Sequence, residues 1–132
     1  MPILTSPALP AQALAAADVV TVIGTFEPAD DSGLGVARVV VTPPPGYATV
    51  TGSAAPNNAQ INVRQLRAGA VLTSLATLVL APGTNLAAES PIAIPIMTSP
   101  ALQQDDVVDV VLHQNGTGLA IPAGLVVEVD VA

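Results

Sequence analysis

Residues 105–132 read DDVVDVVLHQNGTGLAIPAGLVVEVDVA, and this stretch decides the fold class. Two runs rich in valine flank a loop that is punctuated by glycine and proline. In the second run the odd-numbered residues from 125 to 131 are apolar, and Glu128 and Asp130 lie between them. Alternation of this kind predicts a half-buried β-strand, so we expect the end of this chain to be a strand within a sheet.

The rest of the chain repeats short apolar runs separated by turns. Strands are expected over residues 19–26, 36–42, 47–52, 60–67, 71–80, 91–97, 107–113 and 125–131. Residues 71–80 also fit a helical stripe, but their β-rich surroundings favour a strand. A slip of the alternation at Gln65–Leu66 indicates a bulge, and Pro95 indicates an edge strand because proline lacks an N–H.

Strands at this spacing with glycine and proline turns predict an all-β fold, a single antiparallel β-sandwich of jelly-roll type. The sandwich is expected over residues 19–132, preceded by an extended N-terminal arm at residues 1–18. Three prolines within the first ten residues disfavour a helix or a central strand there. A frayed terminus is the alternative interpretation. The arm residues expected to contact a partner are Ile3, Leu4, Leu9 and Leu14.

Composition limits the classes of function. Hydrophobic residues make up 51% of the chain but aromatic residues only 2%, which predicts a core of valine, leucine, isoleucine and alanine. With Phe26 and Tyr47 as the only aromatic residues, a sugar platform or a base-stacking surface is disfavoured. The formal charge of −7 argues against binding nucleic acid or an anionic membrane. No segment is long and apolar enough to predict a membrane-spanning helix, and the N-terminus lacks the basic region of a signal peptide.

Residues that could support chemistry are few, and we expect no enzyme and no cofactor. The single histidine, His113, lies four residues from Asp109, which on a strand corresponds to about 13 Å, too far for a catalytic hydrogen bond. The acidic clusters at Asp30–Asp31 and Asp105–Asp106 match no calcium-loop pattern, so no metal site is expected. The Gly116–Gly118 segment is a turn rather than a phosphate-binding loop, since neither a lysine nor a helix start follows.

The arginines are the remaining candidates for an interface. The chain has three cationic side chains, Arg38, Arg64 and Arg67, and no lysine. Arg64 and Arg67 lie near one expected strand, where they are able to pair with carboxylates within the chain or across subunits. The alternative is that they belong to a solvated face, where exposed pairs stabilise little.

The ending of the chain resembles that of capsid decoration proteins from tailed phages of actinobacteria and similar GC-rich hosts. The matching residues are Asp105–Asp106, Gly116–Thr117–Gly118, Pro122, Gly124 and Glu128. Upstream, Thr25–Phe26–Glu27–Pro28 and the strand containing Asn62, Arg64 and Leu66 also fit, so the resemblance covers residues 20–131. The family often has Gly-Asp before the penultimate strand, where this chain has Asp105–Asp106.

The resemblance implies a structural protein on the exterior of the virion capsid. Its partners would be the major capsid protein and itself, as homotrimers at three-fold and quasi-three-fold positions. A tail or fibre module that binds a receptor is the first alternative. A cupin-like sandwich would need inward-facing histidines and glutamates, and a pilus or surface module would need an export signal.

Overall fold

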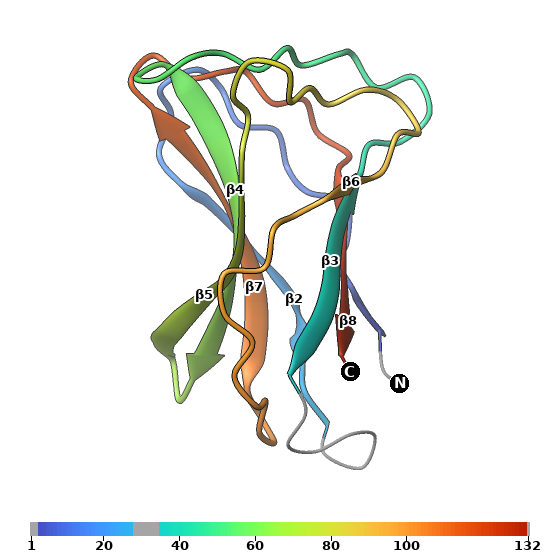
Figure 1. Ribbon diagram of the computed structural model, residues 1–132, viewed down its shortest axis with the longest axis vertical. Helices are drawn as coiled ribbons and strands as arrows, with labels where there is room; N and C mark the ends of the chain where they lie inside the picture. The colour runs from blue at the N-terminus through green and yellow to red at the C-terminus, as the bar shows by residue number, and fades with distance from the viewer. Residues whose placement is uncertain (1–2, 28–34, 132) are drawn as a thin grey trace.

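The computed structural model describes residues 3–27 and 35–131, in which the chain forms eight β-strands and no helix. The strands are β1 (Ile3–Thr5), β2 (Val19–Thr25), β3 (Val36–Thr42), β4 (Asn58–Arg67), β5 (Ala70–Val79), β6 (Ile92–Ala93), β7 (Val107–Asn115) and β8 (Val126–Val131). They form two four-stranded sheets that pack against each other, so the predicted all-β sandwich is confirmed (Figure 1).

The strands pair in a nested order. One sheet has the order β1-β8-β3-β6, and the other has the order β2-β7-β4-β5. The first strand therefore pairs with the last, the second with the seventh, the third with the sixth and the fourth with the fifth. All of these pairings are antiparallel, so the chain resembles one long hairpin folded across itself.

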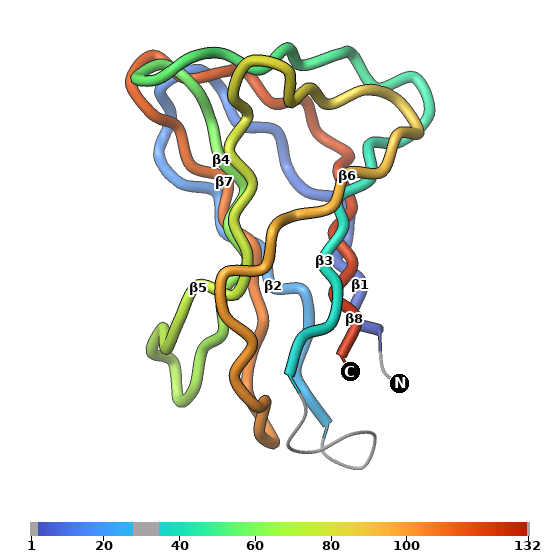
Figure 2. Tube along the Cα trace, viewed as in Figure 1, coloured from blue at the N-terminus to red at the C-terminus, as the bar shows by residue number. Residues whose placement is uncertain are grey.

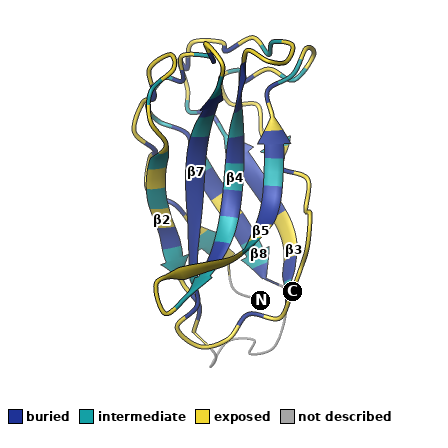
Figure 3. Cartoon of the chain, turned by 90° about the vertical axis from the view of Figure 1, so that its left-hand side faces the viewer, coloured by how far each residue is buried: buried dark blue, intermediate teal, exposed yellow. Residues whose placement is uncertain are grey.

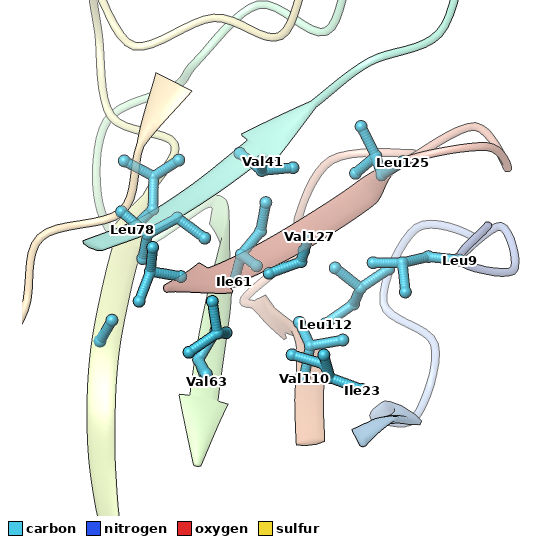
Figure 4. Close-up of a cluster of buried hydrophobic side chains, with 14 of the residues drawn as sticks. Leu9, Ile23, Val41, Ile61, Val63, Leu78, Val110, Leu112, Leu125 and Val127 are labelled. Atoms are coloured by element: carbon cyan, nitrogen blue, oxygen red, sulfur yellow. The ribbon is translucent and has the colours of Figure 1, made fainter. Parts of the chain in front are cut away.

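Aliphatic side chains fill the space between the sheets. Along β8, Val127 and Val129 are fully buried, whereas Glu128 between them is exposed on the outer face, as the alternation predicted. Figure 4 shows Val127 facing Ile61 and other side chains of the opposite sheet. Burying one such side chain stabilises the fold by about 1.5–3 kcal/mol. Both aromatic side chains, Phe26 and Tyr47, are also buried.

The N-terminal segment differs from the extended arm that the sequence predicted. In β1, Leu4 pairs with Val129 of β8, and the chain then continues along the same strand (Figure 2). The backbone N–H of Ser6 donates to Val127 at 2.9 Å, and that of Leu9 donates to Leu125 at 2.8 Å. Pro7 and Pro10 flank these donors without replacing them, so the prolines shorten the regular ladder but do not prevent pairing.

Gln12 attaches the end of this segment to the other sheet. Its backbone pairs with Ile121, and its side chain is buried. The Gln12 amide nitrogen donates to the carbonyl of Leu112 at 2.8 Å, and its amide oxygen accepts from Gln114 at 2.9 Å. Residues 3–12 are therefore part of the sandwich.

Residues 71–80, which fitted both a helix and a strand, lie mostly in β5 (Ala70–Val79). The irregularity expected at Gln65–Leu66 is present, but the extra residue belongs to β5. Gln65 and Leu66 pair with Thr73 and Val71, which leaves Leu72 without a partner, whereas β4 keeps a regular register against β7. Gln65 is thus a polar residue at an inward position, and this explains the apparent slip of phase.

Two other expected strands are shorter than the sequence predicted. Residues 47–52 contribute one isolated bridge, between Val50 and Leu86. Residues 91–97 contribute the two-residue β6, which forms a sheet edge as Pro95 predicted. Prolines at positions 91 and 95 bracket β6, and each lacks the N–H that a longer ladder would use.

Candidate functional site

The outer face of the β2-β7-β4-β5 sheet, which is turned toward the viewer in Figure 3, carries a largely buried ion pair. Arg64 on β4 lies directly opposite Asp109 on β7. The guanidinium donates from Nε to Oδ1 at 2.9 Å and from Nη2 to Oδ2 at 2.7 Å. The Asp109 side chain is 4% exposed and that of Arg64 is 27% exposed. The pair therefore neutralises the centre of this face, and the hydrogen bonds to Asp109 raise the pKa of Arg64.

His113 lies two rows further along the same face, beyond the Asn62–Val111 pair, and contacts Asp18, a residue that the sequence did not connect with it. The Nδ1 atom of His113 is 2.6 Å from Oδ1 of Asp18, which immediately precedes β2. Asp109 is instead the partner of Arg64. Among the described residues, no serine or threonine hydroxyl hydrogen-bonds to His113.

Amide side chains extend this surface toward one end of the sandwich. Asn115 donates to Asn58 at 2.8 Å and to Gln60 at 3.3 Å, while Gln60 donates to Asn62 at 3.4 Å. A depression of about 330 Å³ lies beside them. The residues that line it are Asp18, Gln60, Asn62, Arg64, Ser74, Thr77, Val111 and His113. The surface is polar, but its charges are mostly paired.

Asp106 forms a second ion pair at the opposite end of β4. Its carboxylate is fully buried and accepts from Nε and Nη2 of Arg67 at 2.8 and 2.9 Å. Gln65 and the backbone N–H of Gln103 also donate to it, at 2.8 and 2.9 Å. The hydrogen bond from Arg67 is the main reason that the pKa of Asp106 falls to about 2. Arg64 and Arg67 therefore both pair with carboxylates of their own chain.

The four N-terminal residues that were expected to contact a partner lie in different environments. Ile3 and Leu14 are 58% and 60% exposed. Leu4 packs against the core, and Leu9 is 2% exposed within it. Leu9 is therefore unavailable to a partner while the domain is folded, and the segment does not present one continuous apolar surface.

The acidic cluster at Asp30–Asp31 lies outside the described residues. Within residues 3–27 and 35–131, no group of three or more histidine, cysteine, aspartate or glutamate side chains is placed to hold a metal ion. Gly116 and Gly118 have φ values of 61° and 69°, which is the left-handed turn geometry that the sequence predicted there. The described part of the chain also contains no helix that is long and apolar enough to cross a membrane.

Comparisons of the chain with protein-family models, with curated proteins and with solved structures found no match.

Proposed function

We propose that this chain is a jelly-roll domain that decorates the outside of a phage head and stabilises the shell. The observation that carries the proposal is the nested pairing of eight strands in two four-stranded sheets. A jelly roll is an eight-stranded double sheet built from two Greek keys, and the fold recurs in viral capsid domains, lectins and cupins. The order β1-β8-β3-β6 facing β2-β7-β4-β5 is the order that a rolled hairpin produces.

The interior supports a structural role rather than a cupin-like one. A cupin site would place histidine and glutamate side chains between the sheets, where they could bind a metal. The inward positions here hold mainly valine, leucine and isoleucine, and His113 lies on the outer face. An interior packed with aliphatic side chains resists deformation, as a protein that reinforces a shell must.

The two outer faces differ in how their charged side chains are paired, and this difference supports one orientation on the head. The outer face of the β1-β8-β3-β6 sheet carries Glu128 and Asp130, with Arg38 opposite Asp130. On the opposite face, Arg64 pairs with Asp109 and His113 contacts Asp18, so these side chains have partners within the chain. Because charged groups are costly to remove from water, the second face is better suited to contact the shell. Glu128 and Asp130 would then point away from the particle.

Attachment would depend on many copies acting together. In the proposed arrangement, homotrimers at three-fold and quasi-three-fold positions bridge neighbouring copies of the major capsid protein. Each contact can be weak, because linked contacts raise the effective concentration of the next one. The N-terminal segment does not reach outward in this mechanism, because residues 3–12 are paired with the domain itself.

The polar depression favours a second candidate, a tail or fibre module that binds a receptor. Its amide and hydroxyl lining, including Gln60, Asn62 and Thr77, is able to hydrogen-bond a small polar ligand. The loop at residues 116–124 is less suited to this role, because the backbone N–H of Thr117 donates to Asn57 and that of Leu119 donates to Gln114.

Cryo-electron microscopy of particles that carry this chain tests the proposal directly. Capsid decoration predicts density at the local three-folds of the outer shell. Density on the tail or fibres, or none on the particle, would overturn it.

A matched pair of variants tests the orientation. Thr77→Arg adds a charge to the outer face of β5, and Thr42→Arg adds one to the outer face of β3. Only Thr77→Arg should reduce the occupancy of undecorated heads. Equal loss from both variants would contradict the proposed contact face.

A further inference from the structure

β2 is an unprotected sheet edge. It is seven residues long and lies at the margin of the β2-β7-β4-β5 sheet (Figure 3). Among the described residues, no backbone hydrogen bond joins β2 to any segment other than β7. The strand contains neither proline nor lysine, which proteins commonly use to block an edge, and its one irregularity lies between Val22 and Gly24. Residues 19–22 therefore form a regular edge that another strand is able to extend.

The other sheet edges are short or covered. β1 has three residues and β6 has two. Along β5, the backbone N–H of Thr77 donates to Pro95 at 3.0 Å and that of Met97 donates to Leu75 at 2.7 Å, so the segment 95–98 occupies that edge. Within the part of the chain that the structure describes, β2 is thus the edge that a second copy has free for pairing. The groups that a free edge lacks are those of another free edge, and a second β2 supplies them at matching length.

The faces of the sheet limit how two β2 strands can pair. Val20 and Val22 lie beside Val111 and Asp109 on the outer face and are 54% and 56% exposed, whereas Thr21 between them faces inward. Residues directly opposite each other in an antiparallel pair share a face. A two-fold axis between two copies must therefore pass through a residue and not between two residues. An axis at Thr21 sets Val20 of each copy opposite Val22 of the other.

The axis at Thr21 also keeps the acidic groups apart. Asp18 then falls beside the Gly24 end of the other strand, and Glu27 lies beyond the paired residues. An axis at Val20 would instead set Asp18 against a valine, and charged groups are costly to bury against apolar ones. Like charges directly opposite each other destabilise a strand pair, and the axis at Thr21 places none opposite.

We infer that two copies pair through their β2 edges about a two-fold axis at Thr21, which joins their two β2-β7-β4-β5 sheets into one continuous sheet. The contact is isologous, because each copy uses the same surface. It covers the exposed Val20 and Val22 of both copies. A two-fold contact joins copies in pairs, so in the trimeric arrangement proposed above it would link one trimer to the next. The inference does not depend on what the assembly attaches to, so it can fail separately from capsid decoration.

Disulfide cross-linking tests the axis. The chain contains no cysteine, so an introduced cysteine is the one thiol in each copy. In Thr21→Cys the two cysteines would be directly opposite, with Cα atoms about 4.5–5.5 Å apart, which a disulfide spans. In the control Thr25→Cys, on the same strand, they would be about 26 Å apart. After oxidation with copper phenanthroline, Thr21→Cys should run at about twice the 13.1 kDa chain mass on a non-reducing gel, and Thr25→Cys should not.

A lysine at the edge tests the contact without a cross-link. Val22→Lys adds a charge to the centre of the interface, and the control Val71→Lys adds one to a valine of β5 that is 50% exposed. Light scattering coupled to size exclusion gives the masses, and circular dichroism checks folding. The wild type and Val71→Lys should have equal masses, and Val22→Lys should have half that mass. If Val22→Lys does not fold, Val20→Lys takes its place.

Three results would overturn the inference. One is equal mass for the wild type and the β2 lysine variant. Another is equal cross-linking of Thr21→Cys and Thr25→Cys. The third is a monomeric wild type, which would leave the β2 edge to a strand from a different protein.

Discussion

Replacing Leu9 with alanine should destabilise the folded domain by about 3 kcal/mol. Leu9 is 2% exposed and packs among core side chains, and its backbone N–H and C=O pair with Leu125 and Gly124. The substitution removes buried carbon atoms while leaving both backbone hydrogen bonds in place. The expected loss therefore reflects the transfer of those carbons and the cavity left behind, which together cost about 2–5 kcal/mol for a buried leucine.

Urea denaturation followed by far-ultraviolet circular dichroism measures this change at one fixed protein concentration. A loss of about 3 kcal/mol corresponds to a midpoint lower by about 1–3 M, given the usual slopes for small proteins. Leu14→Ala is the matched control, because Leu14 is in the same segment and 60% exposed. Its free energy of unfolding should change by about 0.5 kcal/mol or less. Equal midpoints for the two variants would refute the assignment of residues 3–12 to the core and restore the free-arm interpretation.

Acid should remove the contribution of Asp106 to the stability of the folded protein. The pKa of Asp106 is about 2 in the folded protein, compared with 3.8 for an unperturbed aspartate. The ionised carboxylate therefore adds on the order of 2 kcal/mol to the free energy of unfolding above pH 3.8, and this stabilisation is lost as the pH falls through 2. The difference in urea midpoint between wild type and Asp106→Asn should narrow over that range, and a constant difference would argue against the assignment. Burial raises the pKa of Tyr47, whose hydroxyl donates to Pro122 at 2.7 Å, to about 12. As the only tyrosine, it should ionise at about pH 12 in the folded protein and near pH 10 in urea, as read at 295 nm. Ionisation near pH 10 in both states would contradict its burial. Gly52→Ala should cost about 1–3 kcal/mol, because the new Cβ would collide with backbone oxygens of Ala81 and Thr84. Ser53→Ala is its control, and equal thermal stability of the two variants would refute the collision.

Alternation of apolar and polar residues was enough to predict the fold class. It predicted the inward face of β8 from residues 125–131, and the β-rich surroundings decided correctly for β5. Alternation gave the wrong face for Gln65. This polar side chain is buried and hydrogen-bonds to Asp106, whereas the pattern places polar residues on the outer face. Alternation also did not predict the nested pairing of the strands. It specifies which face a residue occupies but not which strand lies next to it.

The candidate site was less predictable than the fold, because its contacts join residues far apart in the chain. Pairing of Arg64 and Arg67 with carboxylates was one of two interpretations of the sequence, and the chain alone did not identify Asp109 and Asp106 as the partners. Asp18 is 95 residues from His113, and no local pattern connects them. The N-terminal prolines predicted an extended arm, yet the residues between them form hydrogen bonds to the sandwich that composition does not reveal.

The position of β8 affects how the protein is made. β8 lies between β1 and β3 in its sheet, yet it is the last of these strands to leave the ribosome. Until then β1 and β3 have no strand between them, and pairings as distant as Ile3 with Asp130 make folding slow. A chain interrupted before residue 126 keeps its hydrophobic strands exposed and remains open to proteases. Cellular quality control would therefore remove incomplete copies before they could accumulate.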